Sequence, residues 1–189
     1  MTTHTPKHPR VLSSLRIVRD LPFTDHESAI RGVAILNLEC SDEGPRFSQA
    51  HATFDRTESR ADILRGIVER VPAGATLITR PPDRIDPSEP NADHFGPSDI
   101  QLIKAARQDL DINLIDCLDE DLLPVAAAFA LKLAGPGSSL AAQIRCAPAD
   151  AQVLWLAFLW TQFEQADRSS LSSAFEAWRA IELARQPQA

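Results

Sequence analysis

The stretch Gly32–Ser41, which reads GVAILNLECS, decides the fold class of this chain. Its apolar run from Val33 to Leu38 is rich in β-branched and aliphatic residues, which is typical of a strand buried on both faces. The run closes on an amide and a carboxylate, Asn37 and Glu39, separated by one apolar residue. Hard divalent cations prefer carboxylate oxygens, and Asn37 offers only a neutral carbonyl oxygen. The stretch therefore predicts a strand end with part of a metal site.

The segments on either side alternate between strand-like and helix-like patterns. The apolar residues of Val11–Val18 recur at helical spacing and predict a short amphipathic helical segment. Thr57 or Ser59 can cap a helix over 58–71, and Ser98 can cap another over 98–110. Such alternation predicts a mixed sheet with helices on its faces. The remaining expected strands are 47–54, 75–79 and 112–115, and the remaining helices are 119–133, 138–144, 150–165 and 171–184.

A long irregular segment follows the strand at 75–79. Loops of that length are usually functional or mobile. In α/β sheets the functional groups collect at the strand ends, where Cys40, Arg80 and Asp116 are expected to lie. The prolines that exclude a helix here are Pro81, Pro82, Pro87, Pro90 and Pro97.

Composition restricts the classes of function. The chain has 189 residues, enough for one domain with a core, and a formal net charge of −7. An acidic chain is repelled by phosphate at long range, which disfavours non-specific coating of nucleic acid. Its three cysteines are widely spaced without a CxxC pair, which fits a reducing cytoplasm. No apolar run approaches the ~20 residues that span a bilayer, so no membrane contact is expected.

Four stretches resemble the motifs of the DnaQ-like (DEDD) 3′–5′ exonucleases. Residues 33–41 are similar to the family's first motif, an apolar strand followed by Asp-x-Glu-Thr-Thr. Residues 150–154 are similar to its final motif, an Asp on the last core helix. Residues 138–142 and 114–118 resemble the Ser-Leu-x-x-Leu helix and the Asp-Thr-Leu strand end of the family. The resemblance covers about residues 31–166 and implies a ribonuclease-H-like mixed sheet flanked by helices, with an extra C-terminal helix.

The resemblance implies a two-metal site. In that family four carboxylates hold two divalent metals, Mg²⁺ or Mn²⁺, and one metal activates the attacking water. Glu39 and Asp150 match two of the carboxylates and are the expected catalytic residues and metal ligands. Asn37 stands where the first Asp belongs. Asp83 and Asp86 are the candidates for the middle motif, and Asp116 is a further candidate.

The chain departs from the family at the general base as well. Arg145 stands five residues before Asp150, where a His or Tyr would take the proton, and a guanidinium does not deprotonate at neutral pH. Arg80 and Arg145 are therefore expected to contact substrate phosphate instead. Glu39 and Asp150 also have a plain structural interpretation, as a strand-end residue and a helix-start residue.

Three functions follow as hypotheses. The favoured one is a degenerate, non-catalytic exonuclease-like module that binds a protein partner or nucleic acid. The alternative is an active metal-dependent enzyme that hydrolyses DNA or RNA from a single-stranded 3′ end. The third is an unrelated α/β protein with chance motif matches. The acidic balance favours a protein partner, and Trp178 is the candidate for a partner or homodimer surface.

The expected organisation has three parts. Residues 1–28 form an N-terminal extension, 29–167 the exonuclease-like α/β domain, and 168–189 a C-terminal helix and tail.

Overall fold

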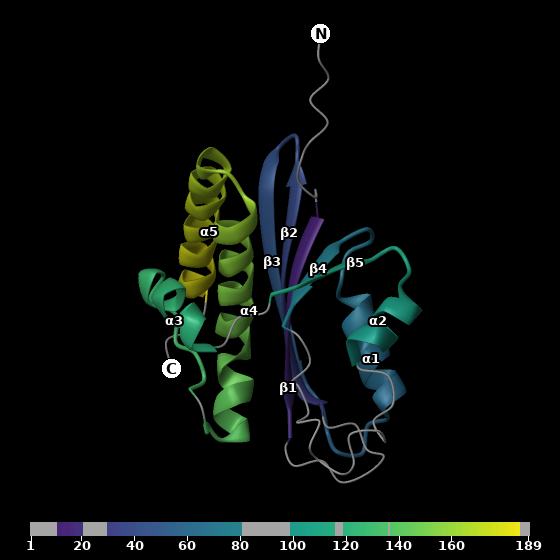
Figure 1. Ribbon diagram of the computed structural model, residues 1–189. Coiled ribbons are helices and arrows are strands. Elements are labelled where there is room, and N and C mark those ends of the chain that lie inside the picture. Colours follow the sequence, from purple (N-terminus) through teal and green to yellow (C-terminus); the bar gives the residue numbers. More distant parts are fainter. Residues whose placement is uncertain (1–10, 21–29, 81–98, 116–118, 136, 186–189) are drawn as a thin grey trace.

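The computed structural model describes residues 11–20, 30–80, 99–115, 119–135 and 137–185. Within these ranges a five-stranded mixed sheet lies between helices on both faces (Figure 1), so the predicted α/β class is confirmed. The strands are β1 (Val11–Arg19), β2 (Ile30–Ser41), β3 (Gly44–Thr53), β4 (Thr76–Thr79) and β5 (Asp111–Leu114). The helices are α1 (Arg60–Glu69), α2 (Asp99–Ala106), α3 (Asp119–Ala128), α4 (Leu140–Gln162) and α5 (Gln165–Arg185).

β1 is the central strand of the sheet, whose order is β3-β2-β1-β4-β5. It pairs antiparallel with β2 and parallel with β4, and β4 pairs parallel with β5. The prediction of a helical segment over Val11–Val18 is therefore wrong. The strand conformation is stabilised because both faces are covered, and the hydroxyls of Ser13 and Ser14 find acceptors on neighbouring elements. The sheet thus includes residues 11–19, which were expected in the N-terminal extension.

The two helices expected over 138–144 and 150–165 are one continuous helix, α4, with Pro148 inside it. Pro148 has no N–H to donate, which usually ends or bends a helix. Here side chains of the sheet bind the carbonyls of that turn. Gln49 Nε2 donates to Pro148 O at 2.7 Å, and Ser14 Oγ donates to Ala151 O at 2.7 Å. These contacts hold the middle of α4 against the sheet beside the proline.

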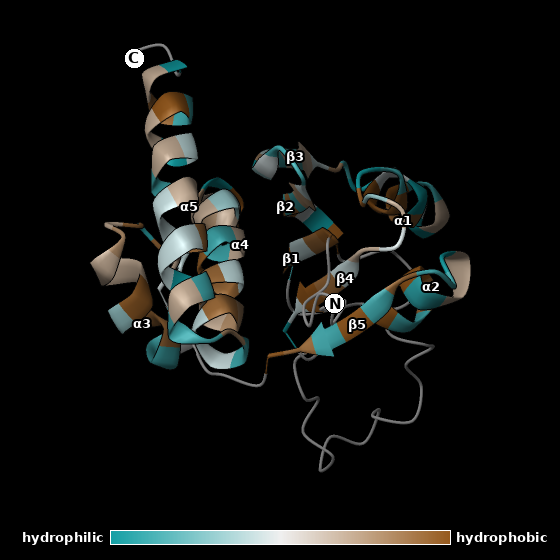
Figure 2. Cartoon of the chain, turned by 90° about the horizontal axis from the view of Figure 1, so that it is seen from above, coloured by the Kyte–Doolittle hydropathy of each residue, from teal (hydrophilic) through white to brown (hydrophobic). Residues whose placement is uncertain are grey.

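The helix over 58–71 is confirmed as α1, and Ser59 is its N-cap, accepting from the Asp62 N–H. α1 and α2 cover one face of the sheet, while α4 covers the other with α3 and α5 outside it (Figures 1 and 2). Each face has its own apolar core. Leu15, Ile17, Val33 and Ile35 pack on the α1 side, and Leu12, Leu36, Leu38 and Trp155 pack on the α4 side.

This alternation fixes the direction of every polar side chain along β1 and β2. Successive residues of a strand point to opposite faces. On β2 the odd-numbered Val33 and Ile35 face α1, and the even-numbered Leu36 and Leu38 face α4. On β1 Leu15 faces α1 and Leu12 faces α4, so Arg16 lies on the α4 side. The two faces can therefore carry separate sets of polar groups.

Candidate functional site

The carboxylate of Asp150 on α4 faces Arg16 of the central strand. Arg16 Nε lies 3.3 Å from Asp150 Oδ2, and the two side chains are 20% and 11% exposed. A charge at this depth costs free energy unless an opposite charge accompanies it. The pair therefore joins the middle of α4 to the centre of the sheet.

Glu39 lies elsewhere on the sheet. It is exposed and pairs across the ladder with Val11, whereas Arg16 pairs with Ala34. The five residues from Ala34 to Glu39 correspond to about 17 Å along the strand. Glu39 also shares its face with Val33 and Ile35, on the side away from α4. The structure does not bring Glu39 and Asp150 together.

Asn37 is buried on the α1 side, where both ends of its amide are engaged. Its Oδ1 accepts from Ser13 Oγ at 2.6 Å, and its Nδ2 donates to Arg70 O at 3.2 Å. The residue thereby links β1, β2 and the end of α1. A carbonyl oxygen already committed to a hydroxyl, on the face opposite Asp150, is poorly placed to complete a metal site with that carboxylate.

Arg80 follows β4 directly and lines the same hollow as Asp150. Leu15 and Thr79 are the last paired residues of the β1–β4 ladder, so Arg16 and Arg80 follow them side by side. The two arginines and Asp150 line a small hollow of about 10 Å³, room for about one water molecule, named here the strand-end hollow. Arg145 lies exposed on α4 and does not line it. Its other walls are Leu122, Leu133, Val153 and Leu154.

Asp83, Asp86 and Asp116 lie outside the described residues. Across the ranges that are described, no group of three or more His, Cys, Asp or Glu side chains is placed to hold a metal ion. Among the described residues, the polar lining of the strand-end hollow is two guanidinium groups and one carboxylate. Guanidinium carries only donors and a permanent positive charge, so this set suits an anion better than a cation.

Arg16 is the site residue that the sequence interpretation missed. A signal for it exists in the run Leu15–Arg19, where single arginines interrupt aliphatic and β-branched residues. A charge inside a buried strand needs a partner. Had Val11–Val18 been interpreted as a strand, this alternation would have drawn attention to Arg16.

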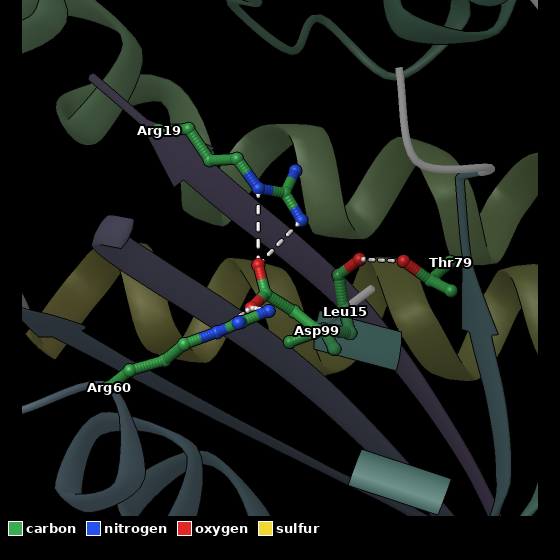
Figure 3. Close-up of polar contacts among 5 residues, drawn as sticks. All are labelled: Leu15, Arg19, Arg60, Thr79 and Asp99. Atoms are coloured by element: carbon green, nitrogen blue, oxygen red, sulfur yellow. Dashed lines mark hydrogen bonds and ion pairs between the residues drawn. The ribbon is translucent and has the colours of Figure 1, made fainter. Parts of the chain in front are cut away.

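A second ionic cluster lies at the carboxyl end of β1 on the α1 side (Figure 3). Asp99, the first residue of α2, is buried and accepts from Arg19 Nη2 at 3.0 Å and from Arg60 Nη2 at 2.9 Å. The Nε atoms of both arginines also donate to it, at 3.3 and 3.0 Å. Nearby, Thr79 Oγ1 donates to Leu15 O at 3.1 Å. The cluster ties β1 to the starts of α1 and α2, a structural role.

Cys40 is poorly suited to act as a reactive thiol. Burial raises the pKa of Cys40, which disfavours the thiolate form that acts as a nucleophile. Cys40 packs beside the aromatic residues of the α4 side. This geometry agrees with the interpretation of the cysteines as small apolar residues.

No protein-family model matches the chain, and no match is found among curated proteins or among solved structures. In the part of the chain that the structure describes, none of the helices is both long enough and apolar enough to cross a bilayer. The geometry around Arg16, Arg80 and Asp150 is therefore the basis for assigning a function.

Proposed function

We propose that the chain is a ribonuclease-H-like exonuclease scaffold that has lost 3′–5′ hydrolysis and works as a binding module. The arrangement of the sheet supports this scaffold. Its order is β3-β2-β1-β4-β5, β2 runs antiparallel to its neighbours, and the late helix α4 crosses β1 and β2 with Asp150 on its inner side. That arrangement is similar to the ribonuclease-H-like fold, in which the central strand and a late helix face each other across the active site.

The observation that carries the proposal is Arg16 opposite Asp150. Two-metal hydrolysis needs carboxylates around the metals to balance their charge and to activate water. Here the residue of the central strand that faces the helix carboxylate is a cation, 3.3 Å away. A divalent metal at Asp150 would have to break this ion pair and would be repelled by the guanidinium. Hydrolysis by the two-metal route is therefore disfavoured at this position.

The remaining features agree with lost catalysis. β1 faces Asp150, so the matching carboxylate of a two-metal site would be needed on β1 rather than on β2. Glu39 and Asn37 lie on the other face, and Arg145 supplies no general base. The net charge of −7 opposes a long polyanion, so we propose a protein partner in preference to nucleic acid.

Incubation of the purified chain with 3′-labelled single-stranded DNA and RNA tests the proposal, in Mg²⁺ and in Mn²⁺. We expect no release of mononucleotides, and no retention of either polymer at physiological salt. Metal-dependent release that is lost in Asp150→Asn and kept in the exposed control Glu176→Gln would overturn it and favour the active exonuclease. Release that survives in both variants belongs to a contaminating nuclease, and a repeat with freshly purified protein then decides.

A further inference from the structure

β3 is an edge strand of the sheet, on the side away from β5 (Figure 2). Among the described strands it pairs with β2 alone. Residues of an antiparallel pair alternate between those that bond to the neighbouring strand and those whose backbone groups point away from it. The Phe54 N–H donates to Arg31 O at 3.0 Å, so the even-numbered residues bond to β2 and the odd-numbered ones point outward. The odd-numbered residues of β3 after Pro45 are Phe47, Gln49, His51 and Thr53.

This edge lacks the features that usually keep a strand from pairing further. Those features are charged side chains, prolines and bulges. Pro45 and Arg46 lie at the start of β3, whereas residues 47–53, which read FSQAHAT, carry neither a formal charge nor a proline. The register with β2 runs through them without a shift. Within the described structure these seven residues therefore present an edge suited to pairing with a further strand.

The edge is self-complementary about Ala50. If two β3 strands pair antiparallel around a twofold axis at Ala50, Phe47 lies opposite Thr53 of the second copy. Gln49 likewise lies opposite His51, so all four outward-pointing residues exchange backbone hydrogen bonds. Ala50 faces its own copy in a non-hydrogen-bonded pair, where side chains come closest and a methyl group fits. Residues 47–53 bring no like charges together in this register.

The ends of the strand add charge complementarity. In the same register Arg46 of one copy lies opposite Phe54 of the other, next to Asp55. Both Arg46, which also pairs with Glu43 of its own copy, and Asp55 are exposed. An exposed ion pair contributes little to affinity, but opposite charges favour this register over those that place Arg46 against its own copy.

α5 supplies apolar surface beside the edge. Trp178, the residue expected at a partner or homodimer surface, packs on Phe47 of β3, and the ring centroids are 5.7 Å apart. One turn later Ile181 is 53% exposed, and Leu183 is 54% exposed. Strand pairing alone makes a small interface, whereas a stable dimer buries about 800 Å² of each partner. These side chains of α5 can add to the buried area.

We propose that the chain forms a twofold dimer in which the β3 strands of two copies pair antiparallel and continue the sheet from one copy into the other. The occupant of the edge is a second copy because each group of the edge finds its complement in the same edge of another molecule. The inference goes beyond the proposed function. It concerns the β3 edge and not the pair of Arg16 and Asp150, so the nuclease assay and the dimer assay fail independently.

Sedimentation velocity of the full chain, from low micromolar to near-millimolar concentration, tests the inference. We expect a concentration-dependent dimer. His51→Pro removes an N–H that points away from β2, and the twofold axis repeats the loss. The dissociation constant should therefore rise by about tenfold or more. His51→Ala keeps the N–H and should dimerise as the unmodified chain does. Circular dichroism establishes that His51→Pro is folded, and Thr53→Lys, which places a charge on the edge, is a second variant expected to weaken the dimer.

Disulfide trapping tests the register, in a background that carries Cys40→Ala, Cys117→Ala and Cys146→Ala. Ala50→Cys should form a covalent dimer on mild oxidation, because the opposed Cα atoms would lie about 4.5 Å apart. Ser48→Cys is the matched control on the same face. It would lie about 13 Å from its own copy and should not cross-link.

Three outcomes overturn the inference. A monomer at every concentration leaves the edge without a second copy, and a dimer that survives both His51→Pro and Thr53→Lys places the contact elsewhere. Loss of the dimer in His51→Ala would assign the contact to the imidazole and overturn the backbone pairing. Cross-linking of Ser48→Cys in place of Ala50→Cys would overturn the proposed register.

Discussion

Arg16 and Asp150 face each other between the central strand and α4, with 3.3 Å between Arg16 Nε and Asp150 Oδ2. Both side chains are largely removed from water, and each compensates part of the cost of burying the other's charge. On the proposed ribonuclease-H-like scaffold, the pair would also occupy the place where a metal-dependent nuclease needs two negative groups. The ion pair thus adds a polar contact to the apolar packing of α4, and it is the observation on which the proposed absence of hydrolysis rests.

Removal of one partner should be costly. Asp150→Ala should lower the free energy of unfolding by about 3 kcal/mol, because a buried guanidinium is left without its carboxylate. The double substitution Arg16→Met with Asp150→Leu should recover most of that loss, since apolar side chains of similar size suit a buried site. Urea denaturation of the three chains measures both effects. Equal losses in the single and double variants would show that the ion pair does not couple these positions.

Recreating in this chain the first motif of the DnaQ-like exonucleases should not confer catalysis. Asn37→Asp recreates the Asp-x-Glu pattern, but the side chain lies on the α1 side. The new carboxylate would lose the Nδ2 donor and face the carbonyl of Arg70, which should destabilise the fold by about 1–3 kcal/mol. The nuclease assay with Mn²⁺ and a urea titration check this. A gain of metal-dependent hydrolysis in this variant would contradict the assignment of Asn37 to a structural role.

The buried carboxylate of Asp99 should contribute to the stability of the fold on the α1 side of the sheet. Asp99→Asn removes the charge that two arginines share and should cost about 2–3 kcal/mol, since hydrogen bonds to charged groups are the stronger kind. Arg60→Gln should cost less, because Arg60 is 40% exposed and Arg19 is 19% exposed. Thermal unfolding of the two variants compares them. If Arg60→Gln lowers the stability more than Asp99→Asn does, the main contact of this cluster is made by Arg60.

Acid should weaken a third ionic contact. The hydrogen bond from Arg107 and then the Gly74 N–H hold the pKa of Asp109 well below its ordinary value. The carboxylate therefore stabilises the fold fully above the unfolded value of about 3.9, and this contribution is lost as the pH falls toward the folded pKa. Unfolding midpoints of the unmodified chain should fall over this acid range more steeply than those of Asp109→Asn. Identical pH dependence of the two chains would show that Asp109 contributes no such linkage.

The backbone of Ala130, in the turn that follows α3, is strained. Ala130 has a φ of 51°, in the left-handed region where a Cβ costs free energy. The turn is closed by Leu131 N donating to Ala126 O at 2.8 Å, a pattern in which glycine is preferred. Ala130→Gly should therefore stabilise the protein by up to about 1 kcal/mol. Ala127→Gly, within the helix, should instead destabilise it by about 1 kcal/mol. Urea titration measures both, and the same sign for both variants would refute the argument.

Local patterns predicted the elements whose signals lie within a few residues. The apolar run at 33–38 predicted a strand, which forms half of β2, and the cap at Ser59 predicted the start of α1. The end of the strand at 75–79 was also predicted, and Arg80 follows β4 there. These predictions succeeded because propensity, capping and burial agree within each segment.

The central strand could not be recognised in the same way. Ser13, Ser14 and Arg16 interrupt its apolar pattern, and their burial is tolerated only because Asn37, Ala151 and Asp150 meet them. Two of those partners lie on α4, far away in the sequence. Matching the first motif to 33–41 then placed Glu39 on the wrong strand and the wrong face for Asp150. The strand conformation of residues 11–19 and the partner of Asp150 depend on contacts between residues far apart in the sequence, which a short stretch of sequence does not reveal.

The central position of β1 also has a consequence for the order of assembly. β1, β2 and β3 follow one another along the chain, so these three strands can pair as an antiparallel meander early in folding. The pairing of Leu12 with Thr76 closes a far longer loop. Because closing a longer loop costs more entropy, we expect β4 and β5 to join the sheet later. No ladder joins β2 directly to β4 in the described sheet. β1 is thus the strand along which the β2–β3 half and the β4–β5 half of the described sheet are joined.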